Sequence, residues 1–382
     1  MTTQSTAVIS PFTVRFDQAA VTDLRTRLAR TRWPAEPAGV GTDQGMPVAT
    51  VREMAEAWAA LDLSAVEARL NAFPQFVTEV DGERVHFWHV RSTVPGATPL
   101  LLLHGWPSSV LEFEAVVGPL TDPAAHGAPA GTPAFDVVVP SLPGFGFSGP
   151  TTSTGWDSAR SAGALARLME HLGYEHWGVA GGDVGALVAR EVGALDPAGL
   201  VGVHVLQWFA FPSGDDEEKA RITPQDWASL QSGSTADFQS KAGYRDIQSK
   251  RPGTLAFALD DSPAGVLAWN AELWTGWGDV PPVGGLETFL AHVSVYWFTG
   301  TSGSAARHYL GDARSGAGYR DLPVRVPVAV AVFPWDFRSI RACVERSANL
   351  VRYTELEQGG HFAYVTDAEA VVGDLREFFG SL

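Results

Sequence analysis

The stretch from His176 to Arg190 constrains the fold of this chain more than any other part of the sequence. The apolar run Trp177–Ala180 is typical of a buried strand, and the run Val184–Leu195 that follows favours a helix. Between them, residues 181–185 read Gly-Gly-Asp-Val-Gly. A strand, a tight turn and a helix in this order form a nucleophile elbow, here with aspartate in the position that serine holds in esterases.

The elbow makes Asp183 a candidate nucleophile. Gly181 and Gly185 stand two positions before and after it, where the turn is too tight for a side chain. The free N–H groups and the positive dipole end of the following helix would keep the Asp183 carboxylate ionised. A simpler alternative is that Asp183 only caps the helix, because aspartate is a favoured N-cap residue. Residues later in the chain favour the nucleophile.

The composition is that of a globular protein with a large core: the chain has 382 residues, of which 45% are hydrophobic and 18% are charged. Its formal net charge of −16 repels phosphate backbones, so we expect no nucleic acid partner. Cys343 is the only cysteine, which excludes an intramolecular disulfide and a cysteine-based metal cluster and suits the cytoplasm. Residues 1–20 lack the pattern of a signal peptide, and no apolar run reaches the roughly 18–20 residues that cross a bilayer. We therefore expect no membrane contact.

The order of the expected elements predicts an α/β fold, with a mostly parallel sheet covered by helices on both faces. Strand and helix patterns alternate over residues 97–207 and again over 321–382, and Leu100–Leu103 is fully apolar, as such sheets require. Residues 208–320 are rich in short helical runs and predict a mostly helical cap over the carboxyl ends of the strands, where these sheets bind ligands. Residues 1–96 form a separate N-terminal region, in which the alternation at Phe12–Phe16 predicts a short strand.

A second glycine-rich stretch raises the question of nucleotide binding. Gly144, Gly146 and Gly149 form a Gly-x-Gly-x-x-Gly pattern after the expected strand Phe135–Pro140. In a dinucleotide site a helix would open directly on this pattern. Here Pro150 and a loop rich in threonine and serine follow, so we do not expect a nucleotide cofactor.

Two residues near the end of the chain complete a candidate catalytic triad. In a fold with this elbow the order along the chain is nucleophile, acid, base. Asp336 follows the apolar run 324–333, and His361 follows two glycines after the last expected strand, Arg352–Leu356. Asp183, Asp336 and His361 thus have the required order, each at a strand end. The alternative, a helix-capping Asp336 and a surface His361, does not account for this combination.

An aspartate nucleophile implies a two-step reaction that needs no cofactor and no metal ion. The carboxylate of Asp183 attacks an sp3 carbon and forms an alkyl ester, and water activated by His361 then attacks the ester carbonyl. We expect the oxyanion hole for the second step from the backbone N–H groups of Trp106 and Val184. A halide leaves without a proton, whereas the oxygen of an epoxide needs an acid. The cap carries tyrosines suited to this role: Tyr244, Tyr296 and Tyr309.

Short motifs spread over nearly the whole chain support this interpretation. They are Leu70–Phe76, Val85–Ser92, His104–Pro107, Pro140–Ser148, Gly243–Gln248, Asp261–Gly265, Tyr296–Tyr309 and Gly359–Phe362. In combination they resemble the epoxide hydrolases of the microsomal-type branch of the α/β-hydrolases. The resemblance implies that an epoxide is opened to a vicinal diol, that Tyr244 and Tyr309 are the acid pair, and that Tyr296 is a packing residue. It also implies that residues 1–96 form an N-terminal meander around the core and the cap.

The resemblance further implies a setting and a substrate class. Relatives without a membrane anchor occur in bacterial secondary metabolism, including antibiotic pathways of the enediyne type that open aryl epoxides. An apolar or aryl epoxide, with water as the co-substrate, is therefore the expected substrate of a soluble, cytoplasmic bacterial enzyme. The sequence leaves open whether the protein forms a homodimer.

Val184 departs from the family pattern, which usually has tryptophan after the nucleophile, and Ala186 stands where serine is common. A smaller residue beside Asp183 is expected to widen the floor of the pocket for a bulkier or differently shaped substrate. A haloalkane dehalogenase is one alternative, but such an enzyme normally holds the halide with an indole N–H from the residue after the nucleophile, which Val184 lacks. The other alternative is a catalytically inactive ligand-binding protein on the same fold. Competent residues at all the catalytic positions argue against it.

Overall fold

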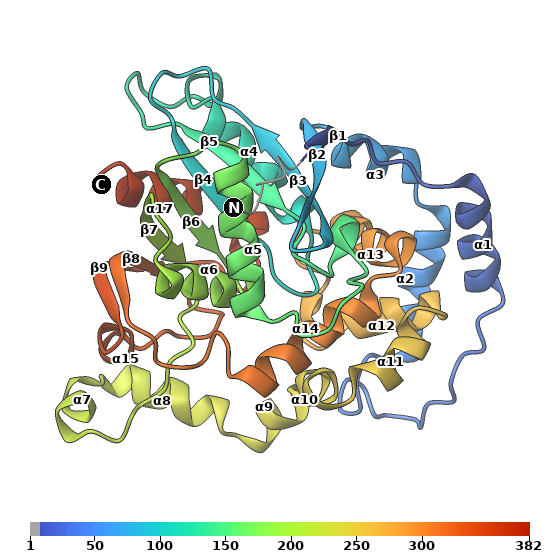
Figure 1. Cartoon of the computed structure of the whole chain (residues 1–382). Coiled ribbons are helices and arrows are strands. Elements are labelled where there is room, and N and C mark those ends of the chain that lie inside the picture. Colours follow the sequence, from blue (N-terminus) through green and yellow to red (C-terminus); the bar gives the residue numbers. More distant parts are fainter. Residues whose placement is uncertain (1–7) are drawn as a thin grey trace.

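A nine-stranded sheet forms the centre of the structure, a computed structural model that describes residues 8–382, the side chains of residues 236–238 excepted (Figure 1). The strand order is β1-β2-β3-β5-β4-β6-β7-β8-β9. Pairing is antiparallel from β1 to β5 and parallel from β5 to β9, which confirms the predicted α/β fold with a mostly parallel sheet. The strands are Ser10–Pro11 (β1), Gln75–Val80 (β2), Glu83–Val90 (β3), Thr98–Leu103 (β4), Phe135–Pro140 (β5), Trp177–Gly181 (β6), Leu200–Val205 (β7), Val324–Val332 (β8) and Ala348–Glu355 (β9).

Helices cover both faces of the parallel part of the sheet (Figure 1). On one face α6 (Val184–Leu195) packs on β4, β6, β7 and β8, with α5 (Ser158–His171) beside it. On the other face α4 (Glu114–Thr121) packs on β5, and α17 (Ala368–Phe379) packs on β7 and β8. Because water is excluded from both faces, the side chains of Leu100–Leu103 in β4 are completely buried, as their apolar sequence predicts.

The chain between β7 and β8 folds into helices. They are Asp216–Arg221 (α7), Pro224–Gly233 (α8), Ala236–Lys241 (α9), Gly243–Lys250 (α10), Pro252–Leu259 (α11), Pro263–Trp274 (α12), Leu286–Thr299 (α13) and Ser302–Ser315 (α14). Helices α10 and α11 pack against α14, and α12 packs against α13. Within residues 8–382, no helix has both the length and the apolar character that crossing a membrane requires.

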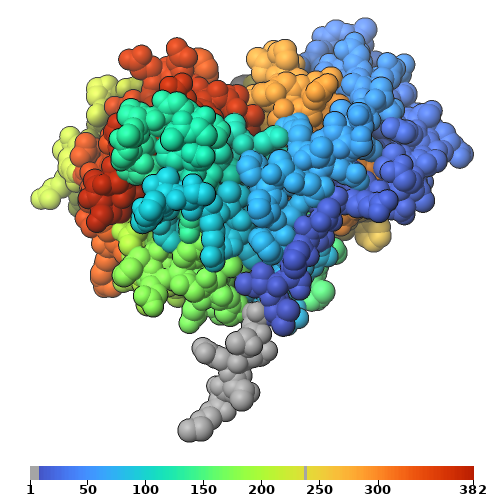
Figure 2. Space-filling view, turned by 90° about the horizontal axis from the view of Figure 1, so that it is seen from above, coloured from blue at the N-terminus to red at the C-terminus, as the bar shows by residue number. Residues whose placement is uncertain are grey.

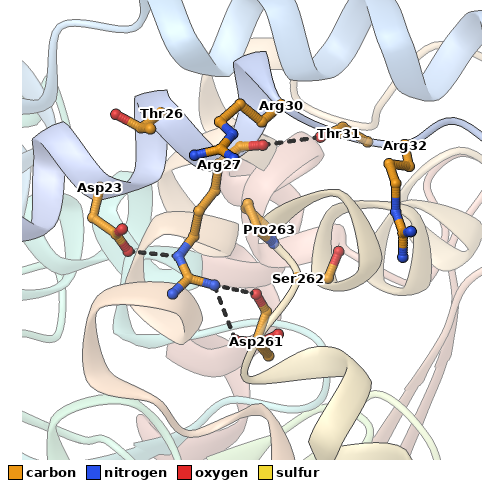
Figure 3. Close-up of a pocket in the computed structure, with 9 residues that line it drawn as sticks. All are labelled: Asp23, Thr26, Arg27, Arg30, Thr31, Arg32, Asp261, Ser262 and Pro263. Carbon is orange, nitrogen blue, oxygen red and sulfur yellow. Dashed lines mark hydrogen bonds and ion pairs between the residues drawn. The ribbon is translucent and has the colours of Figure 1, made fainter.

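The N-terminal region lies against the cap, as the space-filling view shows for its blue and the cap's orange residues (Figure 2). Its helices are Gln18–Ala29 (α1), Val48–Ala60 (α2) and Leu63–Leu70 (α3), and both α1 and α2 contact α12. In α1, Arg27 donates to Asp23 at 2.6 Å and to Asp261, just before α12, at 2.9 Å (Figure 3). These ion pairs are exposed and contribute little, so buried packing and the 2.9 Å bond from Trp58 Nε1 to Ser294 Oγ hold this junction. The first seven residues of the predicted region 1–96 lie outside the described residues.

The predicted strand at Phe12–Phe16 is wrong, although its alternating burial is real. Val14 and Phe16 are buried, but strand β1 ends before this segment. The side chain of Asn71 replaces a neighbouring strand, because its Oδ1 accepts from Val14 N–H at 2.8 Å and its Nδ2 donates to the Val14 carbonyl at 2.9 Å. A distant side chain thus satisfies the backbone groups that a sheet would otherwise pair.

Candidate active site

The register of the sheet brings the candidate catalytic loops together. Leu103, Gly181 and Val205 are the last residues of β4, β6 and β7, and they lie side by side in the sheet. Val332 and Glu355, the last residues of β8 and β9, are paired in the same way. When neighbouring parallel strands end at the same level, the loops that follow them lie together at one edge of the sheet.

Asp183 occupies the tight turn between β6 and α6. Its backbone has φ 52° and ψ −124°, a conformation that residues with a side chain rarely adopt and that costs about 1–3 kcal/mol. A Cβ on Gly185 would overlap the Leu103 carbonyl oxygen, and a Cβ on Gly181 would overlap the Gly185 backbone. The prediction that the turn has no room for side chains at these positions is confirmed. Such local strain is typical of functional sites.

The loop after β4 lies directly on the Asp183 carboxylate. A Cβ on Gly105 would overlap the Asp183 side chain, so only glycine allows this approach. The Trp106 N–H donates to Asp183 Oδ1 at 2.8 Å. Val184 begins α6, so its N–H is one of those that have no carbonyl partner within the helix. The Trp106 N–H thus holds Oδ1, while Oδ2 lies 3.6 Å from His361 Nε2.

His361 lies between the two aspartates. Its Nδ1 is 2.9 Å from Asp336 Oδ1, and its Nε2 is 3.6 Å from Asp183 Oδ2. The loops that carry Asp336 and His361 are aligned by an isolated parallel bridge between Trp335 and Gly360. The structure thus brings together the three residues that the sequence places far apart.

The charge around His361 favours its protonated form. Burial alone would lower the pKa of the imidazole, but the charge and the hydrogen bond of Asp336, together with the charges of Asp183 and Glu112, raise it to about 9. An imidazole with this pKa is protonated at neutral pH while Asp183 carries its charge. Loss of the Asp183 charge removes one of the causes that raise the pKa.

Gln207 is a site residue that sequence reasoning missed. It follows β7 and is buried, with its Oε1 accepting from the Asp183 N–H at 2.7 Å and its Nε2 donating to Asp336 Oδ2. One amide therefore connects the nucleophile's strained turn to the acid. The sequence contained one indication of this role: Gln207 is a polar residue between the apolar residues Leu206 and Trp208, directly after a core strand.

We expect Gln207→Leu to lower kcat about 10- to 100-fold, because the triad loses its alignment. The substitution keeps the size of the side chain but leaves the Asp183 N–H and one Asp336 oxygen unpaired, which costs about 1–3 kcal/mol of unfolding free energy. Steady-state kinetics and urea unfolding would measure both effects. The exposed Gln231→Leu in α8 is the matched control, and an unchanged kcat in Gln207→Leu would show that the amide does not position the triad.

Two aromatic rings of the cap, Tyr244 in α10 and Tyr309 in α14, pack against Trp106, whose N–H donates to Asp183. Tyr244 stacks on Trp106 with 5.2 Å between ring centroids, and Tyr309 meets the same indole edge-on at 5.9 Å. The two tyrosine rings are 6.3 Å apart. Burial raises the pKa of both phenols above the usual value of tyrosine, and the charge of Asp183 adds to this increase. Both phenols therefore keep their protons at neutral pH.

Tyr296 differs from these two residues. It is completely buried in α13, and its hydroxyl donates to the Ser108 carbonyl at 2.8 Å. Its proton is therefore used in a structural hydrogen bond, in agreement with the packing role that the sequence resemblance implied.

The fold and the site define the class of this protein as an α/β-hydrolase. Residues 98–231 match the family model of the alpha/beta hydrolase fold, and residues 9–113 match the model described as the epoxide hydrolase N terminus. A protein of Stigmatella aurantiaca is 40% identical over 98% of this chain and 85% of its own length. Epoxide hydrolase 1 of Oryctolagus cuniculus is 30% identical over 97% of this chain and 89% of its own length.

Solved structures agree with these relatives. The epoxide hydrolase of Aspergillus niger superposes with a TM-score of 0.82 at 30% identity, covering 99% of this chain and 98% of the other. The juvenile hormone epoxide hydrolase of the silkworm Bombyx mori has a TM-score of 0.86 at 26% identity and covers 98% and 95% of the two chains. This chain belongs to the epoxide hydrolase family, and it is a hydrolase that acts on the ether bond of epoxides. The dehalogenase and the inactive binding protein considered above are thereby set aside.

Proposed function

We propose that Asp183 opens the epoxide by nucleophilic attack and becomes esterified. Oδ2 attacks, because the N–H of Trp106 holds Oδ1. The bond between Oδ2 and the epoxide carbon forms as the bond from that carbon to the ring oxygen breaks. The ring oxygen takes a proton from Tyr244 or Tyr309, since an alkoxide is too basic to leave unprotonated.

In the second step, water attacks Cγ of Asp183 and gives a proton to His361 Nε2. The negative charge that develops on Oδ1 is stabilised by the N–H groups of Trp106 and Val184. Esterification prepares this step, because it removes the Asp183 charge that helps to raise the pKa of His361. The imidazole then loses its proton more readily and can act as the base. Asp336 holds Nδ1 and stabilises the imidazolium that forms.

The observation that carries this proposal is the position of His361. Its Nδ1 is bound to Asp336 at 2.9 Å while its Nε2 faces Asp183 Oδ2 at 3.6 Å. A base in this position can serve a water molecule that approaches the Asp183 ester. A serine-type mechanism has no nucleophile here, because aspartate occupies the elbow.

A single turnover in 18O-labelled water tests the proposal. We expect the first diol from styrene oxide to be unlabelled, because its new oxygen comes from Asp183 Oδ2. Label should then appear in the peptide that contains Asp183, measured by mass spectrometry of diol and protein. Labelled diol in the first turnover would mean direct attack by water and would exclude the ester.

We further propose an apolar or aryl epoxide as the substrate. The rings of Trp106, Tyr244 and Tyr309 supply an aromatic wall beside Asp183, and the small Val184 leaves more room than the usual tryptophan. A role in bacterial secondary metabolism and a cytoplasmic location stay predictions from the sequence. Activity on a series of aryl and alkyl epoxides would test the substrate class.

A further inference from the structure

Two stretches of chain join the cap to the sheet, and both run past α6, the helix that follows the nucleophile (Figure 1). The first connection, residues 206–215, leads from β7 to α7. The second connection, residues 316–323, leads from α14 to β8. Tyr244 and Tyr309 lie in the cap, whereas Asp183 lies in the core. The two connections therefore help to set the distance between the phenols and the carboxylate.

Arg190 of α6 binds both connections at once. It is buried, with 3% of its surface exposed, and its guanidinium carbon lies 4.8 Å from the centroid of the Trp208 ring. Its Nη1 donates to the carbonyl oxygens of Phe209 and Gly318, each at 3.0 Å. Its Nη2 donates to the Arg320 carbonyl at 2.8 Å. One planar, rigid group thus holds the first connection and the second connection together.

Glu191, the next residue of α6, also binds the second connection. Its Oε1 accepts from the Gly318 N–H at 2.6 Å, and its Oε2 accepts from Arg320 Nη2 at 3.0 Å. The backbone of Gly318 lies so close to α6 that a Cβ there would stand 2.8 Å from Leu187 Cβ. Side chains of α6 therefore bind both the N–H and the carbonyl of Gly318.

Arg346, before β9, bridges the same two connections a second time. It donates from Nη1 to the Phe211 carbonyl at 3.2 Å and pairs through Nη2 with Asp321 Oδ2 at 2.8 Å. Arg190 Nη2 is 3.5 Å from the other oxygen of Asp321. A buried guanidinium costs desolvation free energy that an apolar side chain would avoid. Its directed bonds, however, fix both connections at a defined place on α6.

We propose that Arg190, with Glu191, is a positioning residue for the first chemical step. By fixing both connections, it holds Tyr244 and Tyr309 where a phenol can give its proton to the epoxide oxygen while Asp183 attacks the carbon. This inference rests on the proposed function, since it uses the two steps of that mechanism.

The two steps depend on the cap to different degrees. Ester formation combines the phenols of the cap with the carboxylate of the core. Hydrolysis of the ester uses the triad and the oxyanion hole, all of which belong to the core. A shift of the cap is therefore expected to slow the first step and to spare the second, which a general loss of stability would not do.

Arg190→Lys tests the proposal, with the two steps measured separately. Lysine keeps the charge but has one nitrogen in place of the planar fork, so it cannot hold all three carbonyls. We expect ester formation from styrene oxide to slow about 10- to 100-fold, because a small displacement of the acid has an effect of this size. Ester hydrolysis should stay within about twofold. Quenched-flow kinetics would give both rates, and intact mass would follow the ester.

Arg376→Lys is the matched control. Arg376 of α17 donates to the Pro119 carbonyl of α4 at 2.8 Å, so it joins two helices of the core and does not touch the cap connections. We expect this variant to change neither rate by more than about twofold.

The outcomes separate this inference from the proposed function. An unchanged rate of ester formation in Arg190→Lys, or an equal slowing of both steps, would overturn the role of Arg190 while leaving the ester mechanism intact. Failure of His361→Gln to accumulate ester in the same assay would overturn the mechanism itself, and the inference with it. If Arg190→Lys does not fold, Glu191→Gln takes its place: selective slowing of ester formation supports the proposal, and unchanged rates or equal slowing of both steps contradict it.

Discussion

His361→Gln is expected to stop the enzyme after one turnover. Attack by Asp183 Oδ2 needs no base, so the ester still forms. Glutamine cannot accept the proton of the attacking water, and the steady-state rate should fall about 10²- to 10⁴-fold. The geometry behind this expectation is the position of Nε2, 3.6 Å from Asp183 Oδ2.

The measurement is the stoichiometry of the trapped ester. We expect one epoxide to be consumed per active site, a mass increase of the protein equal to that of the epoxide, and almost no diol. His176→Gln is the matched control, because His176 is exposed and precedes β6, at the end of the strand opposite to Asp183. Continued turnover by His361→Gln would remove His361 as the base.

The double variant Tyr244→Phe, Tyr309→Phe should lose ester formation almost completely. Each single variant is expected to slow this step about 10- to 100-fold, and the double variant by more than about 10³-fold, because no other acid would protonate the departing oxygen. The raised pKa values of both phenols mean that both protons are present at neutral pH, so removal of either hydroxyl removes a donor.

Stopped-flow measurement of the burst phase would follow this step directly. Tyr296→Phe is an informative comparison, because it removes a hydroxyl bound to the Ser108 carbonyl. We expect it to lower the unfolding free energy by about 1 kcal/mol and to change the burst rate only a few-fold. Unchanged burst rates in both single variants and in the double variant would contradict the assignment of the acid pair.

Local signals in the sequence predicted the framework well. The helix at Val184–Leu195 has the bounds that its sequence indicated. Such a pattern predicts a helix well because the spacing of apolar residues in the helix's own sequence indicates which of its faces is buried.

The sequence by itself determined the positions of Asp183, Asp336 and His361. Each follows a strand of a parallel sheet, and the ends of such strands meet at one edge whatever the details of packing. The resemblance of the cap motifs to those of epoxide hydrolases implied that Tyr244 and Tyr309 are the acid pair and that Tyr296 is a packing residue.

Only the tertiary structure decided the second layer of the site. Gln207 belongs to no motif, and its importance comes from the atoms that it meets, the Asp183 N–H and Asp336 Oδ2. The same holds for Asn71, whose side chain took the place of a strand beside Val14. Hydrogen bonds between residues that are distant in the chain follow no period in the sequence, so they emerge only when the packed elements bring the donors and acceptors together.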